Sequence, residues 1–263
     1  MRSEQQLLEA NSQAQIEHRL REGRIGWVGP LLVLTGRSVF MIFAQGIVAG
    51  IYLLRGHPSP WNAAAPWWTV YGTLVDLGCL ALMAKFTRPE GIRLRDLIGQ
   101  VRLRWGYDLI LGVACFVVFV LAFSFPGFLA SKLVFGTTQP ALYPGLLAER
   151  RLPFWAVIYS FGIWLPIWSP TEEMTYNGYV LPRIQALTSS KTVSVMLVGF
   201  WWALQHCFIP FILDWKYVVW RFLFFLPGVL IGSLIYLRIR RLAPLILAHW
   251  PMDLMAVMYT LKF

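Results

Sequence analysis

Long apolar stretches constrain the fold of this chain more than any other feature of its sequence. A helix needs roughly 20 apolar residues to cross the hydrocarbon of a bilayer. Seven stretches approach this length, namely residues 30–54, 65–86, 106–131, 153–170, 192–214, 218–238 and 242–261. Only 14% of the residues are charged, against about 25% in ordinary soluble domains. We therefore predict an all-α fold, a polytopic integral membrane bundle of about seven to eight transmembrane helices.

The Lys and Arg residues are distributed unevenly between the two sides of such a bundle. If the seven stretches cross in alternation, fifteen of the 23 Lys and Arg residues fall on the side of the N-terminus, seven fall on the other side, and Arg37 lies within the first stretch. Because cytoplasmic loops carry the excess of Lys and Arg, we expect a multi-pass protein of the cell membrane with a cytoplasmic N-terminus. These loops also explain the net charge of +10, so we expect the lipid bilayer, and no nucleic acid, as a partner.

The expected domain organisation is simple. Residues 1–25 are polar and charged and form a cytoplasmic N-terminal segment, whereas residues 26–263 form a single transmembrane domain. The sequence contains no internal repeat, so this domain is not expected to consist of two related halves.

Two adjacent carboxylates, Glu172 and Glu173, stand at the end of an apolar stretch. An ionisable side chain at membrane depth is expensive and marks a candidate functional site. Successive residues of a helix point about 100° apart, so we expect one carboxylate to face an internal cavity and the other to face a neighbouring helix or the aqueous rim. A structural alternative is a helix cap, because Ser169 and Glu172 have the spacing of a capping box with Pro170 at the first helical position.

The two histidines within apolar stretches, His206 and His249, follow the glutamate pair in the sequence. His249 and Asp253 are four residues apart, which places them on one face of a helix. Glutamate, histidine and aspartate together suit the activation of water and the stabilisation of an oxyanion. The alternatives are structural: His206 is a core residue with Trp202 packed on its ring, and the pair of His249 and Asp253 ties the bundle together.

The same side chains are potential metal ligands. Imidazole nitrogens and carboxylate oxygens bind zinc and similar divalent ions. Glu172, His206 and His249 are the set that we expect to hold such an ion if one is bound. The sequence requires no cofactor, and a divalent metal such as zinc is the one candidate.

Two further charges lie within the first two apolar stretches. Arg37 and Asp76 are each surrounded in sequence by apolar residues, and a charge at membrane depth usually pairs with another. We expect them to form a structural ion pair between the first two transmembrane helices rather than a part of the catalytic site.

The motifs, in this order, resemble the CAAX protease and bacteriocin-processing family, the membrane proteins related to type II CAAX prenyl endopeptidases. That family carries a Glu-Glu-x-x-x-Arg motif, a Phe-x-x-x-His motif and a His-x-x-x-Asn/Asp motif on successive helices. Residues 172–177 match the first motif except at its last position, residues 202–206 match the second with Trp for Phe, and residues 249–253 match the third. The resemblance covers roughly residues 155–260 and indicates a protease-like core at about residues 153–263.

The resemblance implies an intramembrane endopeptidase whose site opens toward the cytoplasmic leaflet. By analogy, Glu172 is the general base for the attacking water, His206 helps to position that water, and Glu173 orients neighbouring groups. His249 and Asp253 face the tetrahedral intermediate, with Asp253 either protonated or holding His249 in its donor state. The family has been described both as glutamate-dependent and as metal-dependent.

We therefore predict hydrolysis of a peptide bond in a membrane-associated protein or peptide, which is the expected partner of the site. One alternative is a non-catalytic membrane scaffold or immunity-type member of the same fold. Asn177 favours it, because this residue replaces the family arginine with a side chain that forms hydrogen bonds but carries no charge. A second alternative is a proton-coupled transporter, since intramembrane acids and histidines also form proton relays. The lack of repeated halves argues against a transporter.

Overall fold

The computed structural model describes residues 10–99, 104–138 and 150–262. Over these residues the chain is helical apart from two short strands, β1 (Arg150–Arg151) and β2 (Leu261–Lys262), which pair in parallel. The longer helices are α3 (Val28–Leu54), α5 (Trp68–Thr87), α7 (Trp105–Phe135), α11 (Lys191–His206), α12 (Trp215–Ile239) and α13 (Ala243–Thr260). The shorter elements are α2 (Gln13–Arg21), α4 (Pro60–Ala64), the 3-10 turn η1 (Ala65–Trp67) and α6 (Leu94–Ile98).

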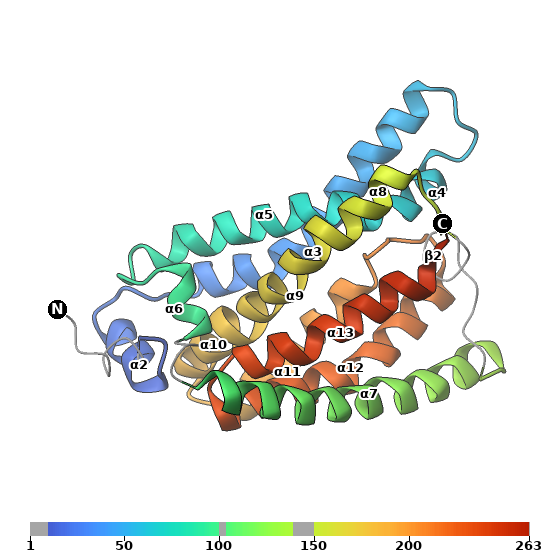
Figure 1. Ribbon diagram of the computed structural model, residues 1–263. Helices are drawn as coiled ribbons and strands as arrows, with labels where there is room; N and C mark the ends of the chain where they lie inside the picture. The colour runs from blue at the N-terminus through green and yellow to red at the C-terminus, as the bar shows by residue number, and fades with distance from the viewer. Residues whose placement is uncertain (1–9, 100–103, 139–149, 263) are drawn as a thin grey trace.

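One continuous helical rod connects β1 to the turn before α11. It consists of five segments, α8 (Phe154–Tyr159), η3 (Ser160–Trp164), α9 (Leu165–Glu173), η4 (Met174–Val180) and α10 (Leu181–Thr188). Both η3 and η4 are π-helical, and π segments within α-helices are frequent at functional sites. Figure 1 shows the rod passing between α5 and α13, and α9 contacts both of these helices. The rod therefore lies inside the bundle from α9 onward, whereas α8 at its start is largely exposed.

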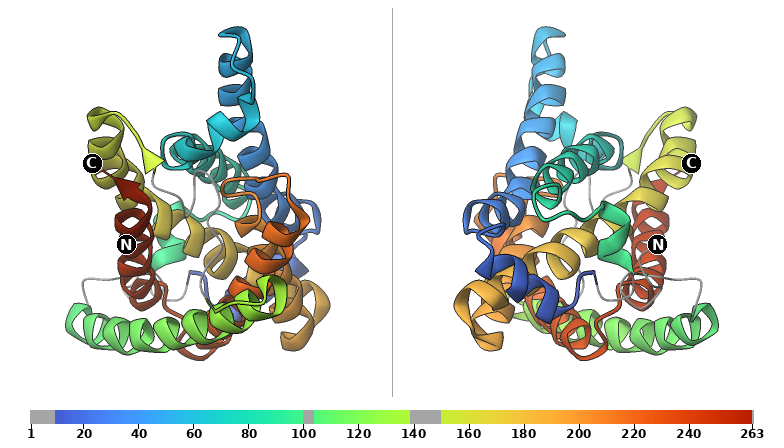
Figure 2. Two further views of the ribbon diagram at one scale, coloured as in Figure 1. Left: turned by 90° about the vertical axis from the view of Figure 1, so that its right-hand side faces the viewer. Right: turned by 90° about the vertical axis from the view of Figure 1, so that its left-hand side faces the viewer.

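The remaining helices enclose the rod on two sides. α3 packs against α5, whereas α7 packs against α12 and α13, and α11 packs against α12. Figure 2 shows that the helices cross at different angles and that the C-terminal end of α3 projects beyond the others. The rod thus receives side chains from both groups of helices.

Two expected helix boundaries are wrong. Ser169 does not cap a helix, because α9 begins at Leu165 and continues from the segments before it. Residues 192–214 do not form one helix, since α11 ends at His206 and the turn that follows contains Pro210. A proline has no backbone N–H to continue a helix, so the histidine lies at a helix end rather than in its middle.

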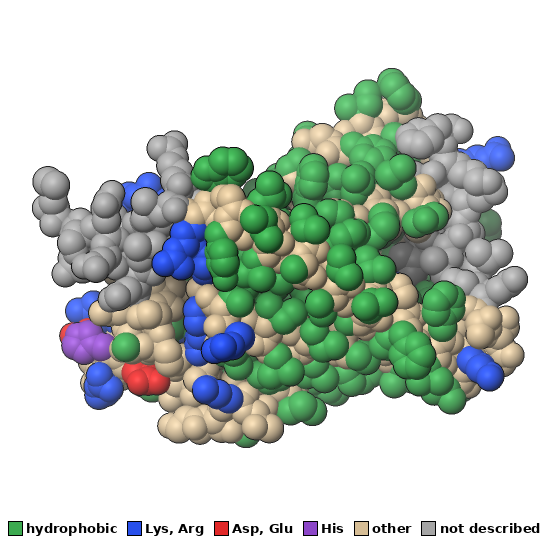
Figure 3. Space-filling model, turned by 60° about the horizontal axis from the view of Figure 1, so that its bottom comes forward, with side chains coloured by type: hydrophobic (Ala, Val, Ile, Leu, Met, Phe, Trp, Pro, Cys, Tyr) green, Lys and Arg blue, Asp and Glu red, His purple; other side chains and the backbone are tan. Residues whose placement is uncertain are grey.

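The length and apolarity of its helices identify this bundle as a membrane protein. Four helical stretches among the described residues are long and apolar enough to cross a membrane: Val28–Leu54, Pro60–Thr87, Trp105–Phe135 and Trp215–Ile239. α7 presents large apolar side chains outward, with Phe125 74% exposed and Ile110 73% exposed. Figure 3 shows apolar side chains over most of one face, while Lys and Arg side chains gather toward one end. Extensive exposed apolar surface marks a membrane-contacting protein.

The predicted count of seven to eight spans is not confirmed. The rod is interrupted by π segments, α11 has 16 residues, and α13 carries His249 and Asp253 within its 18 residues. Because a crossing helix needs roughly 20 predominantly apolar residues, these elements differ from the four long helices by their shorter length or by their polar side chains.

Candidate active site

Glu172 lies near the middle of the rod, and its side chain is fully buried. Its Oε1 atom accepts hydrogen bonds from the indole N–H of Trp202 and, at 3.0 Å, from Nε2 of Gln205. Nε2 of His206 lies 3.4 Å from the same oxygen. The other oxygen, Oε2, lies 3.5 Å from Nη2 of Arg37. This single carboxylate therefore connects the rod to α11 and to α3.

His206 is oriented by the last turn of α11. Its Nδ1 atom lies 2.8 Å from the carbonyl oxygen of Trp202. A carbonyl only accepts hydrogen bonds, so Nδ1 carries the proton of the neutral ring and Nε2 is left as an acceptor on the side of Glu172. The structural alternative, in which Trp202 packs on this ring, does not hold. The imidazole stacks on Phe225 with ring centroids 3.7 Å apart, whereas Trp202 stacks on Tyr176 at 5.0 Å.

Glu173 points toward α13. Its Oε1 atom lies 3.1 Å from Nδ1 of His249, and its Oε2 atom accepts a hydrogen bond of 2.8 Å from Asn177. Nε2 of His249 lies 3.7 Å from Oδ1 of Asp253, and Ser169 donates to Oδ2 of Asp253 at 2.5 Å. A carboxylate thus lies near each ring nitrogen of His249, one from the rod and one from α13 itself.

Arg37 is fully buried in α3 beside these groups. Its Nη1 atom lies 2.7 Å from Oδ1 of Asp76, which confirms the predicted ion pair between α3 and α5. Nε donates to Oε1 of Gln205 at 3.1 Å, and the guanidinium carbon lies 4.1 Å from the ring centroid of Trp168. The sequence did not predict the further contact between Arg37 and Glu172.

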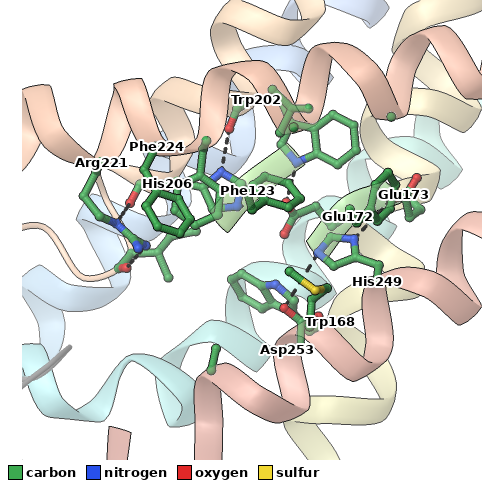
Figure 4. Close-up of a pocket in the computed structure, with 18 of the residues that line it drawn as sticks. Phe123, Trp168, Glu172, Glu173, Trp202, His206, Arg221, Phe224, His249 and Asp253 are labelled. Atoms are coloured by element: carbon green, nitrogen blue, oxygen red, sulfur yellow. Dashed lines mark hydrogen bonds and ion pairs between the residues drawn. The ribbon is translucent and has the colours of Figure 1, made fainter. Parts of the chain in front are cut away.

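A cavity of about 660 Å³ adjoins these side chains. Its wall includes all five predicted catalytic residues together with many Trp and Phe side chains. The predicted residues are Glu172, Glu173, His206, His249 and Asp253. Figure 4 shows Glu172 between His206 on one side and His249 and Asp253 on the other. The structure therefore brings together side chains from the rod, α11 and α13 that are far apart in the sequence.

The cavity extends from the glutamates toward one end of the bundle. Its wall reaches Trp68 at the start of α5, Arg221 near the start of α12 and Thr260 at the end of α13. Lys85 and Arg238, two of the cations expected on the cytoplasmic side, lie at the opposite ends of α5 and α12. The cavity thus occupies the half of the bundle that is remote from this basic end.

The predicted metal ligands do not form a metal site in this geometry. No group of three His, Cys, Asp or Glu side chains is arranged to hold a metal ion within residues 10–99, 104–138 and 150–262. Oε1 of Glu172 is already bonded by two N–H donors, and the ring nitrogens of His249 lie near Glu173 and Asp253. A metal ligand must present a free lone pair, which Oε1 of Glu172 lacks, and Glu172, His206 and His249 are not arranged as a shared set of ligands within the described residues.

Three residues of the site were missed by sequence reasoning. Gln205 bridges Arg37 and Glu172, and only its position next to His206 pointed to it. Ser169 was assigned to a cap. Arg221 was counted as a loop charge, yet it is 9% exposed on the cavity wall. Its guanidinium donates to the carbonyl oxygens of His206 and Ile209 at 3.1 Å, which stabilises the C-terminal end of α11.

A comparison with known families agrees with the arrangement of the three motifs. Residues 150–255 match the family model described as Type II CAAX prenyl endopeptidase Rce1-like. No curated protein and no solved structure matches the chain. The matched residues include Glu172, Glu173, His206, His249 and Asp253 but exclude α3, α5 and α7. The part of this chain that carries the three motifs is therefore similar to the Rce1-like type II CAAX prenyl endopeptidases, as the order of the motifs in the sequence predicts.

Proposed function

We propose that the protein is a membrane-embedded endopeptidase that hydrolyses a peptide bond of a membrane-associated protein or peptide. One observation carries this proposal: Glu172 and His206 meet on the wall of a cavity within an apolar bundle, with His249 and Asp253 across from them. A family of proteases matches the same part of the chain. Apolar surroundings strengthen electrostatic interactions in such a site.

The water molecule is activated between Glu172 and His206. Glu172 is the general base, and Nε2 of His206 accepts a hydrogen bond from the same water because the proton of the neutral ring is on Nδ1. The water oxygen attacks the peptide carbonyl while its proton passes to Glu172. The proton then moves to the nitrogen of the leaving amine as the carbon–nitrogen bond breaks.

The negative charge on the tetrahedral intermediate is stabilised from α13. Nε2 of His249 lies 3.7 Å from Asp253, which is too long for a hydrogen bond, so an N–H at this position is available to a substrate oxygen. Glu173 orients the ring through its other nitrogen. Of the two roles left open for Asp253, this geometry supports an ionised aspartate that holds His249 in its protonated donor state by charge rather than by a hydrogen bond.

The charge distribution supports an orientation with the basic end of the bundle in the cytoplasm of a cell-membrane protein. In this orientation the chain has a cytoplasmic N-terminus, and the rod, α11 and α13 lie within the bilayer along with the four long helices. The cavity then extends toward the outer half of the bilayer. This direction differs from the opening toward the cytoplasmic leaflet that the family resemblance implies.

The proposal is tested by comparing the N- and C-terminal ends of all proteins in membrane fractions of cells that carry either the intact protein or the Glu172→Gln variant. The substitution keeps the size of the side chain and removes the base, so we expect termini that appear with the intact protein and disappear with the variant. Removing a general base lowers rates by about 10²–10⁴-fold. Glu90→Gln is a matched control, because Glu90 is also buried and ion-paired but lies outside the cavity wall.

Identical termini for the intact protein and Glu172→Gln, at equal protein levels, would refute proteolysis. That result would favour a non-catalytic scaffold of the same fold. Loss of the same termini in Glu90→Gln would show that the effect reports on folding rather than on the site.

A further inference from the structure

We propose that Arg37 is a positioning residue for the glutamate pair and supplies, from α3, the fixed positive charge that the motif itself lacks. This inference rests on the proposed function. It concerns a residue outside the part of the chain that matches the protease family, which spans residues 150–255.

Position 177 provides no charge near the glutamates. Nδ2 of Asn177 donates to Glu173 at 2.8 Å, and its Oδ1 atom is buried without a hydrogen-bond partner among the described residues. Arg183, the next arginine of the rod, does not compensate, because its guanidinium pairs with Glu90 at 2.5 Å. The first motif of this chain therefore contains two carboxylates and no cation of its own.

Arg37 contacts one oxygen of Glu172 directly and is connected to the other through Gln205. Nη2 lies 3.5 Å from Oε2, and Nε donates to Oε1 of Gln205 at 3.1 Å. Gln205 in turn donates to Oε1 of Glu172 at 3.0 Å. A guanidinium is planar, and its donors are fixed relative to one another. One rigid group thus sets the position of Glu172 directly and also sets the position of the amide that holds its second oxygen.

Asp76 anchors the guanidinium on the side away from the site. Its Oδ1 atom lies 2.7 Å from Nη1 of Arg37, and both side chains are fully buried. The cluster of Arg37, Asp76 and Glu172 therefore contains one permanent cation and two carboxylates. Buried carboxylates without a cation are strongly unfavourable, so Arg37 contributes both to folding and to the placement of the base.

These two contributions are separable by a double substitution. Arg37→Met alone leaves two buried carboxylates facing each other and is expected to destabilise the protein. Arg37→Met combined with Asp76→Asn removes one cation and one carboxylate and so restores the net charge of the cluster. Because Glu172 keeps its hydrogen bonds from Trp202 and Gln205, we expect this variant to fold. If Arg37 positions Glu172, the folded double variant remains defective, since methionine at position 37 offers the glutamate neither a charge nor a hydrogen-bond donor.

The experiment measures how fast the Glu172-dependent termini appear in membrane fractions after expression is induced, normalised to the amount of folded protein. We expect the Arg37→Met/Asp76→Asn variant to be about 10²-fold slower than the intact protein, the loss typical of removing one electrostatic contact from a catalytic site. Arg37→Lys keeps a cation without the planar fork. We expect it to be slower than the intact protein but faster than the double variant, a partial rescue that a purely structural role would not give.

The matched control is the pair of Arg183→Met and Glu90→Gln. This pair removes a buried ion pair of similar geometry that is remote from Glu172, and we expect the rate to stay within about threefold of the intact protein, as for sites that do not interact. A double variant of Arg37 and Asp76 that is as fast as this control would overturn the role of Arg37 alone. A double variant that fails to fold would also count against it, because the charge argument predicts folding. Termini that do not depend on Glu172 would instead overturn the proposed function.

Discussion

The hydrogen bond between Ser169 and Asp253 offers a direct way to establish the charge of the aspartate. Ser169 is fully buried, and its hydroxyl donates to Oδ2 of Asp253 at 2.5 Å. Ser169→Ala removes only the hydroxyl. The proposed mechanism requires Asp253 to be an ionised carboxylate beside His249, so the substitution removes a hydrogen bond to a charged acceptor.

The expected magnitude follows from the type of acceptor. A hydrogen bond to a charged group contributes about 1.5–3 kcal/mol to stability, whereas one between neutral groups contributes about 0.5–1.5 kcal/mol. Ser160 is an internal reference on the same rod, because it is also fully buried but contacts only Thr69 Oγ1 and the carbonyl of Ala156, both at 2.8 Å. We expect Ser169→Ala to lower the free energy of unfolding by about 1 kcal/mol more than Ser160→Ala does.

The assay is reversible unfolding in detergent micelles, applied to both serine variants and to a double-mutant cycle of Ser169→Ala with Asp253→Asn. The asparagine keeps the shape of the acceptor but removes its charge. We expect a coupling free energy of about 1 kcal/mol or more between positions 169 and 253, within the range found for residues in one hydrogen-bond network.

Two results would refute this reasoning. If Ser169→Ala costs no more than Ser160→Ala, Asp253 is not an ionised acceptor and its assignment as the holder of His249 is wrong. If the cycle shows no coupling above about 0.5 kcal/mol, which is the limit of simple additivity, the hydroxyl and the carboxyl do not interact in the folded protein.

Two further predictions concern the walls of the site. Trp202→Phe keeps an aromatic ring but removes the indole donor to Glu172, so we expect it to lower the free energy of unfolding by about 1.5–3 kcal/mol. Trp201→Phe is the control in the same unfolding assay, because the neighbouring indole has no described hydrogen bond to a carboxylate. Equal losses of stability in the two variants would contradict the prediction. Gly228→Ala places a Cβ atom against the ring of Phe123 of α7 on the cavity wall, and we expect the free energy of unfolding to fall by about 1–3 kcal/mol from overpacking. Gly46→Ala in α3 is the control, because its Cβ meets nothing within 4 Å, and it should be neutral or stabilise the helix by up to about 1 kcal/mol. A smaller loss at position 228 than at position 46 would be inconsistent with this packing.

Several features of the site could be predicted because they depend on one helix at a time. The two glutamates diverge, with Glu172 directed to α11 and Glu173 directed to α13, as the angle between successive helical residues requires. His249 and Asp253 lie within 3.7 Å because they are four residues apart. The pairing of Arg37 with Asp76 was predictable for a different reason, since a charge within an apolar helix needs a counter-charge.

Other expectations were wrong where a distant contact competed with a local one. The sequence around Ser169 has the form of a helix cap, but the hydroxyl bonds to Asp253, which is 84 residues away. Packing of Trp202 on the ring of His206 was the structural alternative, but Trp202 stacks on Tyr176 of the rod and donates to Glu172. In both cases a buried polar group found a partner on another helix, and no local pattern contained that partner.

The sequence alone determined that this chain forms a helical membrane bundle and that its polar motifs follow the order of the CAAX protease family. Length and apolarity define such helices, and short spacings define which side chains share a face. Only the tertiary structure decided which faces meet. Arg37 and Glu172 are 135 residues apart, and their contact depends on how α3 packs against the rod. Helix packing also determines toward which end of the bundle the cavity extends and which side chains contact each glutamate. Packing between helices depends on the fit of whole surfaces, which no short sequence pattern contains.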